Sequence, residues 1–100
     1  MSEPPIVVFA PDLMDRSRIS AALPDAVFVR RADDLASTPA RLVLLDLGRP
    51  GALDAIGRIA APVIGFGAHV DDALLDAARA AGCAEVLPRS RFFRRLADLA

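Results

Sequence analysis

Three side chains that can bind metals or anionic groups come just after apolar stretches of the sequence: Asp12, Asp46 and His69. If the stretches are parallel strands, their carboxyl ends share one edge of a sheet, where ligands bind. Together the three residues offer oxygen and nitrogen ligands for a transition metal. Each also has a simpler interpretation: Asp12 as a helix cap, Asp46 as an acid held by loop amides or an arginine, and His69 as a solvated loop residue.

The composition limits the classes of protein and mechanism. The chain has 100 residues, of which 54% are hydrophobic and 25% charged, so we expect one globular domain over residues 1–100. All 12 basic residues are arginine, which excludes any mechanism that needs a lysine. The net charge of −1 argues against a nucleic-acid partner.

The single cysteine and the amino-terminal segment suggest the compartment. Cys83 has no partner for an intramolecular disulfide, and we interpret it as a small buried apolar residue in a reducing environment. The stretch "IVVFA" is too short for a signal peptide or a membrane span. We therefore expect a cytoplasmic protein without a membrane partner.

Apolar stretches alternate with helical patterns along the chain. Strands are predicted at residues 6–10, 26–30, 42–46, 62–66 and 84–87. Helices are predicted from Asp12, with Asp15 completing a capping box, to about Leu23, from Pro50 through Ile59, from Asp71 to Ala81, and after a Ser90 cap. Pro39 restricts the second helical segment to about one turn.

This alternation predicts the fold class. Five strand–helix units indicate a flavodoxin-like α/β fold, a three-layer sandwich around a parallel sheet of strand order 2-1-3-4-5 with a shortened second helix. In the helix at residues 71–81, one stripe at helical spacing predicts the buried face: Val70, Leu74, Ala77, Ala78 and Ala81. Leu75 lies off that stripe, so we expect it to contribute to an exposed patch.

Three stretches resemble the receiver domain of two-component response regulators, the CheY-like fold of bacterial phosphorelay signalling. They are "IVVFAPDLMDRSRI", "LVLLDLGRPG" and "PVIGFGAHVDDALLDAARAAGCAEVL", and the resemblance covers nearly the whole chain. It places Asp46 at the phosphoacceptor position. It implies a non-enzymatic signalling role without catalytic residues. Receivers hold a divalent cation with an acidic pair of which Asp12 is what remains here, so we expect no cofactor, with Mg²⁺ at Asp12 and Asp46 as the weaker alternative.

The sequence departs from the receiver pattern at the positions that support phosphorylation. Pro11 stands where receivers have one acid of a metal-binding pair, Gly67 where they have a hydroxyl, and Pro88 where they have a lysine. Arg89 is the nearest cation, and with Gly67 and His69 it is expected at the rim of the pocket. The sequence thus resembles a degenerate receiver, or pseudo-receiver, which implies signalling by protein contact without phosphorylation.

Two alternative functions stay open. In the first, a histidine kinase phosphorylates Asp46, with Asp12 holding Mg²⁺. In the second, the edge binds a small ligand or nucleotide. The segment "GFGAH" at residues 65–69 has the first two glycines of a dinucleotide-binding motif, but Val70 replaces the third small residue.

The segment "RSRFFRR" at residues 89–95 predicts either an amphipathic helix with a solvated cationic face or a docking surface. Receivers associate through their fourth helix, fifth strand and fifth helix. The resemblance therefore implies an interaction surface, for another signalling protein or for a second copy, formed by Leu75, Arg91, Phe92, Phe93, Arg94 and Arg95.

Overall fold

The computed structural model describes residues 3–100 of the chain as helices packed on a five-stranded sheet. The strands are β1 (Ile6–Phe9), β2 (Val27–Phe28), β3 (Leu42–Asp46), β4 (Val63–Gly67) and β5 (Glu85–Pro88). They pair in the order β2-β1-β3-β4-β5, and each neighbouring pair is parallel. The predicted fold class and strand order are confirmed.

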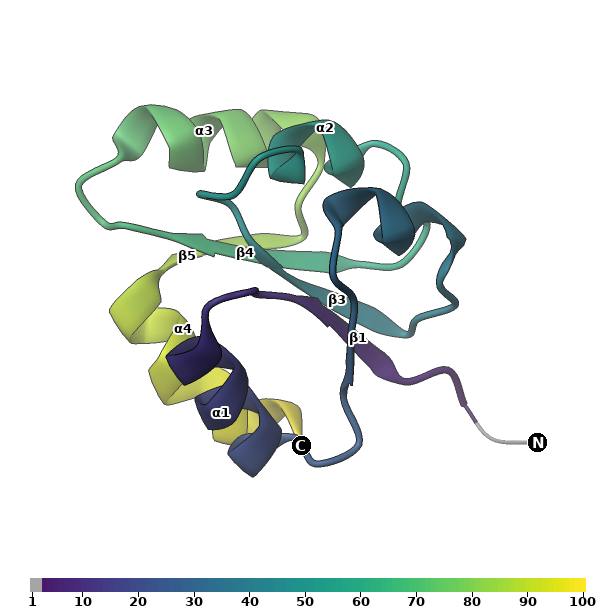
Figure 1. The fold of residues 1–100 in the computed structure, drawn as a ribbon. Coiled ribbons are helices and arrows are strands. Elements are labelled where there is room, and N and C mark those ends of the chain that lie inside the picture. The colour runs from purple at the N-terminus through teal and green to yellow at the C-terminus, as the bar shows by residue number, and fades with distance from the viewer. Residues whose placement is uncertain (1–2) are drawn as a thin grey trace.

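Helices cover both faces of the sheet (Figure 1). The helical elements are α1 (Leu13–Ala22), η1 (Ala32–Ser37), α2 (Ala52–Ile56), α3 (Asp72–Ala81), α4 (Arg89–Arg95) and η2 (Leu96–Leu99). The elements α1, α4 and η2 lie on one face, and η1, α2 and α3 lie on the other. The second helical segment is the 3-10 helix η1, as the prediction of a shortened helix required.

Each face of the sheet has its own apolar core, because successive residues of a strand point to opposite faces. Val8 and Leu44 pack toward α1 and α4, whereas Val7 and Val43 pack toward α2 and α3. All four are fully buried. Burying one such side chain stabilises the fold by about 1.5–3 kcal/mol, which explains why the central strands are continuously apolar.

Several elements begin or end one to three residues from the predicted positions, and the reasons are local. The second strand covers two residues instead of 26–30, because β2 is an edge strand that pairs only with β1. Helix α2 begins at Ala52 instead of Pro50, because Gly51 has a φ of 81° and cannot continue an α-helix. Helix α4 begins at Arg89 without a side-chain cap, so Ser90 lies inside it and does not cap it.

Helix α3 has the predicted ends. Asp71 caps it, since its side chain accepts a hydrogen bond of 3.1 Å from the backbone N–H of Leu74. Gly82 ends it with a φ of 114°, in the left-handed region that glycine adopts readily. These ends hold the helix against β4 and β5.

The buried face of α3 differs from the prediction. Leu75 and Ala78 are its buried residues and Leu74 is half-buried, whereas the other members of the predicted stripe, Val70, Ala77 and Ala81, are exposed. The alanine-rich helix is rotated so that its two leucines, its largest apolar side chains, contact the core. Leu75 is only 5% exposed and therefore cannot contribute to a docking surface.

Cys83 lies between α3 and β5 and packs, half-buried, against the core under α2 and α3. Burial raises the pKa of its thiol, and a backbone hydrogen bond with Gly65 acts in the opposite direction. The raised pKa fits the predicted apolar role, because a reactive cysteine needs a depressed pKa. Within residues 3–100, no helix is long and apolar enough to cross a membrane.

Candidate functional site

Asp46 is the last residue of β3 and lies between β1 and β4 at the carboxyl edge of the sheet. It is 6% exposed. Its Oδ1 accepts a hydrogen bond of 3.1 Å from the backbone N–H of Gly48, and its Oδ2 accepts one of 3.3 Å from Nε of Arg49. Both predicted kinds of donor, a loop amide and an arginine, are therefore present.

The donors to Asp46 come from the turn that follows it. Gly48 and Arg49 are only two and three residues further along the chain. The Arg49 side chain is 41% exposed, so its guanidinium group can leave the carboxylate without disturbing the core. This arrangement neutralises the buried acid locally, as the cost of burying an unpaired charge requires.

Asp15, in the first turn of α1, is a second buried acid, and sequence reasoning did not assign it to the site. It is 3% exposed, and its Oδ1 accepts a 2.6 Å hydrogen bond from Nη2 of Arg89. Its Oδ2 is buried and has no hydrogen-bond partner in the described part of the chain. One signal could have identified it: Asp15 is four residues before the apolar Ile19, so it lies on the buried face of α1.

Arg89 lies at the same edge, as predicted, but its direct partner is Asp15. That hydrogen bond raises the pKa of Arg89, burial opposes the rise, and the charges of Asp15, Asp46 and Asp12 add to it. The guanidinium carbon also lies 5.5 Å from the ring centre of Phe66 and 5.4 Å from that of Phe93. Arg89 is therefore fixed by one carboxylate and two aromatic rings.

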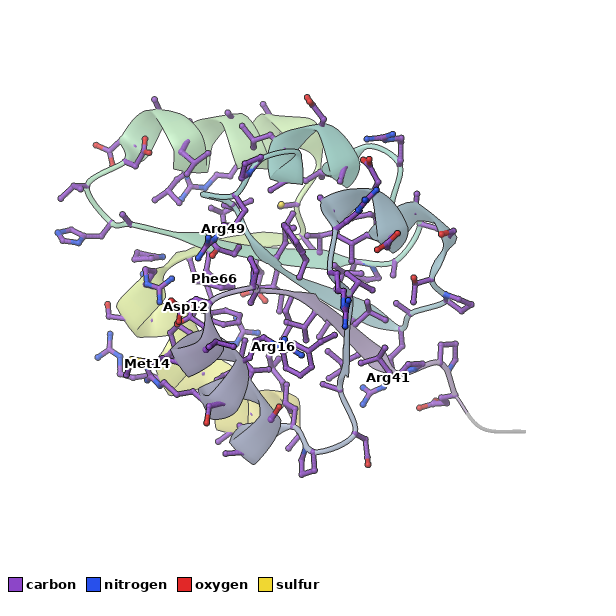
Figure 2. The ribbon with its side chains drawn as sticks, viewed as in Figure 1. Asp12, Met14, Arg16, Arg41, Arg49 and Phe66 are labelled. Carbon is purple, nitrogen blue, oxygen red and sulfur yellow. The ribbon has the colours of Figure 1, made fainter. Side chains whose placement is uncertain are left out.

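Asp12 has the simpler of its two predicted roles. It caps α1, because its Oδ1 accepts a 3.0 Å hydrogen bond from the backbone N–H of Asp15. The Asp15 side chain binds Arg89, so it does not complete the predicted capping box. In Figure 2, Asp12 lies toward the same end of the sheet as Arg49 and Phe66.

The predicted transition-metal cluster does not form. His69 is exposed after β4, and within residues 3–100 no three histidine, cysteine or acidic side chains come together to hold a metal ion. The weaker expectation, Mg²⁺ bound by Asp12 and Asp46 alone, stays a prediction.

Gly67 ends β4, where receivers have a hydroxyl-bearing residue, and apolar side chains occupy the space beyond it. A Cβ atom at this position would lie 3.4 Å from Cδ2 of Leu75 and 3.5 Å from Cδ2 of Leu74. These are ordinary contact distances, so a single added carbon would fit beside the two leucines. Position 67 thus offers Asp46 no side-chain donor.

The predicted interaction surface is only partly exposed. Phe92 and Phe93 are buried against Phe66 of β4. The Phe92 ring stacks on that of Phe66 at a ring-centre distance of 4.1 Å, and the Phe93 ring meets it edge to face at 5.7 Å. The assignment of Phe92 to that surface was therefore wrong, whereas Phe93, at 8% exposed, still lines a hollow between α1 and α4. Arg95 pairs with Glu85 of β5, which raises the pKa of Arg95. Arg91 and Arg94 are exposed.

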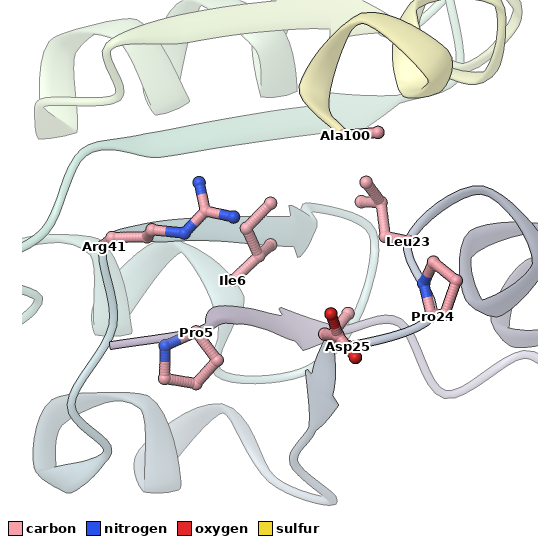
Figure 3. A pocket seen from close by; sticks show the side chains of 8 residues that line it. Pro5, Ile6, Leu23, Pro24, Asp25, Arg41 and Ala100 are labelled. Carbon is pink, nitrogen blue, oxygen red and sulfur yellow. The ribbon is translucent and has the colours of Figure 1, made fainter. Parts of the chain in front are cut away.

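A small hollow lies at the opposite, amino-terminal edge of the sheet (Figure 3). It measures about 160 Å³, and its lining includes Pro5, Leu23 and Pro24, with Asp25 and Arg41 as its charged residues. Its position at the starts of the strands separates it from Asp46.

Comparison of the sequence with protein-family models and with curated proteins finds no match. Solved structures do match. A response regulator from Hahella chejuensis superposes with a TM-score of 0.81 and 19% identity, over 98% of this chain and 92% of that one. The phosphorylated cyanobacterial phytochrome response regulator RcpA gives a TM-score of 0.80 and 15% identity, over 98% and 91% of the two chains.

The chain has the receiver fold. Its architecture is that of response-regulator receiver domains, as the resemblance implied. NtrX from Brucella abortus shows the same receiver fold within a longer protein, with a TM-score of 0.76 and 18% identity over 99% of this chain. This chain spans 27% of NtrX. At these identities the comparisons establish the fold, and the chemistry of the site has to be argued from its own residues.

Proposed function

We propose that this receiver-fold domain is a cytoplasmic pseudo-receiver, which signals by contact with another protein and without phosphorylation of Asp46. The observation that carries the proposal is the pairing of both buried acids at the carboxyl edge. Arg49 neutralises Asp46, and Arg89 neutralises Asp15. The domain needs no enzymatic activity of its own for this role.

The surroundings of Asp46 support the proposal because phosphoryl transfer depends on positioning and on donors that neutralise developing charge. Mg²⁺ prefers octahedral oxygen coordination, and Pro11 stands where a second acid would help Asp12 to hold it. Losing one well-placed donor typically slows a reaction about a hundredfold. The second acid, the hydroxyl at position 67 and the lysine are all missing, so transfer to Asp46 becomes too slow for signalling.

The position of Asp46 favours the alternative function, phosphorylation by a histidine kinase. It lies at the end of the central β3, and the exposed Arg49 side chain is able to swing away from it. RcpA, which has the same fold, was solved in a phosphorylated form. In this alternative Asp46 would receive the phosphoryl group, with Asp12 and Mg²⁺ assisting.

Incubation with acetyl phosphate and Mg²⁺, followed by intact-mass measurement, distinguishes the two. We expect no gain in mass for the wild type and none for the matched control, Asp46→Asn. A gain of about 80 Da, the mass of one phosphoryl group, in the wild type but not in Asp46→Asn would show that Asp46 is an acceptor and that the proposal is wrong. A Pro11→Asp, Pro88→Lys variant tests whether the missing acid and the missing lysine prevent the transfer. Introducing both side chains should raise the fraction of protein that is phosphorylated.

A hollow of about 380 Å³ near the carboxyl ends of β1 and β2 favours a further alternative, a small-ligand sensor. Its lining includes Phe9, Arg30, Arg31, Asp33 and Gly51. A thermal-shift screen with nucleotides addresses it: a shift that Arg30→Gln with Arg31→Gln abolishes would favour a sensor, and no shift is expected under the pseudo-receiver proposal.

A further inference from the structure

An arginine-rich groove lies between α1 and α4, which are neighbours on one face of the sheet (Figure 1). We call it the arginine groove, and its volume is about 560 Å³. It is lined by Arg18 of α1 and by Arg89, Ser90, Phe93 and Arg94 of α4. No acidic residue belongs to this lining, whereas the chain as a whole has a net charge of −1.

The three arginines in the groove differ in whether an acidic side chain neutralises them. Asp15 pairs with Arg89, but Arg18 and Arg94 form no ion pair within residues 3–100. The guanidinium carbon of Arg18 lies 4.0 Å from the ring centre of Phe93, so the ring holds this cation in place. Because it is already ordered, Arg18 loses less conformational entropy when it binds an anion.

Two exposed apolar residues begin α1, the helix that contributes Arg18 to the groove. Leu13 and Met14, in the first turn of α1, are 78% and 76% exposed. Met14 precedes Arg18 by four residues, so both lie on the same side of the helix. Figure 2 shows Met14 on the outer side of α1, away from the sheet. Methionine and arginine are both enriched in protein interfaces.

We propose that the arginine groove docks an acidic segment of a partner protein. Carboxylates of the segment bind Arg18 and Arg94, the Ser90 hydroxyl donates a further hydrogen bond, and an apolar side chain of the segment packs on Met14. Guanidinium groups suit this role because their planar N–H groups bind carboxylates in pairs. The inference rests on the proposed function, and it moves the contact surface away from the buried Leu75 and Phe92.

The groove fits a peptide better than other anions. The net charge of −1 provides no general attraction for nucleic acid. A small polyanion would use the guanidinium groups but not the apolar surface of Leu13 and Met14. An acidic segment with apolar residues uses both.

The test is a titration of the full chain into a fluorescein-labelled peptide of alternating glutamate and leucine, followed by fluorescence anisotropy. We expect salt-sensitive binding that Arg18→Gln with Arg94→Gln weakens about tenfold or more. The matched control is Arg58→Gln with Arg79→Gln. This control also removes two positive charges, but from exposed ion pairs outside the groove, so it should bind the peptide as tightly as the wild type does.

Two further arms make the outcome decisive. Met14→Ser should weaken the peptide several-fold but leave the binding of tripolyphosphate unchanged. Equal weakening by both double variants, or no binding to a folded wild type, would overturn the proposal, as would tripolyphosphate binding better than the peptide. Thermal melting verifies that each variant folds. The acetyl phosphate experiment tests Asp46 alone. Failure of peptide binding would therefore overturn the docking proposal for the arginine groove without contradicting the proposed function.

Discussion

Asp46 and Asp15, the two acids buried in the described part of the chain, are both paired with an arginine, but in different ways. Arg49 is three residues from Asp46, whereas Arg89 is 74 residues from Asp15. Both oxygens of Asp46 have donors, whereas Oδ2 of Asp15 has none. One pair is made by a single turn of the chain, and the other connects α1 to α4. The turn thus provides hydrogen bonds to the buried Asp46 without connecting separate elements of the fold, whereas the Asp15–Arg89 pair helps to hold α1 against α4.

The largest difference between the pairs should come from removing each arginine. Arg89→Ala leaves Asp15 buried without a donor and removes contacts with Phe66 and Phe93. It should lower the free energy of unfolding by about 2–4 kcal/mol, below the range for a fully buried pair because Arg89 is 42% exposed. Arg49→Ala leaves the Gly48 donor and should cost less than about 1 kcal/mol. Urea denaturation of both variants measures the difference, and equal losses would contradict the distinction.

A double-mutant cycle should show a smaller effect of the same kind. Asp15→Asn combined with Arg89→Gln should give a coupling energy of about 1–2 kcal/mol, since the contact is short, at 2.6 Å, and Arg89 is the carboxylate's one side-chain donor in the described part of the chain. Asp46→Asn with Arg49→Gln should give less than about 0.5 kcal/mol, because its contact is longer, at 3.3 Å, and the Gly48 amide remains as a donor to the acid. Chemical denaturation of the four variants in each cycle supplies the numbers. A larger coupling for Asp46 would reverse the assignment of which pair is structural.

The smallest effect is the response of the two couplings to salt. At about 1 M salt the screening length falls to about 3 Å, which weakens interactions that solvent reaches. The two arginines are about equally exposed, at 41% and 42%, so both couplings should fall, and the Asp15 coupling should stay the larger because its contact of 2.6 Å is shorter than the 3.3 Å contact of Asp46. Repeating both cycles in high salt tests this, and a larger remaining coupling for Asp46 would contradict it.

Much of the fold could be predicted because local patterns specify it. Continuous apolar runs specified β1, β3 and β4 to within about one residue, and Gly82 fixed the end of α3. The rotation of α3 was not predictable, because its alanines form a second plausible stripe and only packing decides between the two. Phe92 was misassigned because an amphipathic pattern shows that a helix has an apolar face but not what covers it.

The candidate site was predictable where its chemistry is local. The donors to Asp46 lie in the next three residues, and both kinds of donor, an amide and an arginine, were expected, although Arg89 and not Arg49 was the arginine named. The role of Asp15 was missed because its partner follows 74 residues later, and no pattern in a single sequence pairs residues so far apart. The α4 side of the arginine groove lies within the segment predicted as a docking surface, whereas its α1 side, Arg18, was missed for the same reason.

The connection between α1 and α4 has a consequence for how the protein is made. A ribosome synthesises Asp15 long before Arg89, so the acid emerges without its partner. The apolar residues that face α4, among them Ile19 and Phe66, also stay uncovered until Phe92 and Leu96 arrive. In the nascent chain, one face of the sheet is therefore covered by its helices before the other, whose apolar residues stay exposed. General chaperones that bind exposed apolar segments should bind this face until the last helix is synthesised.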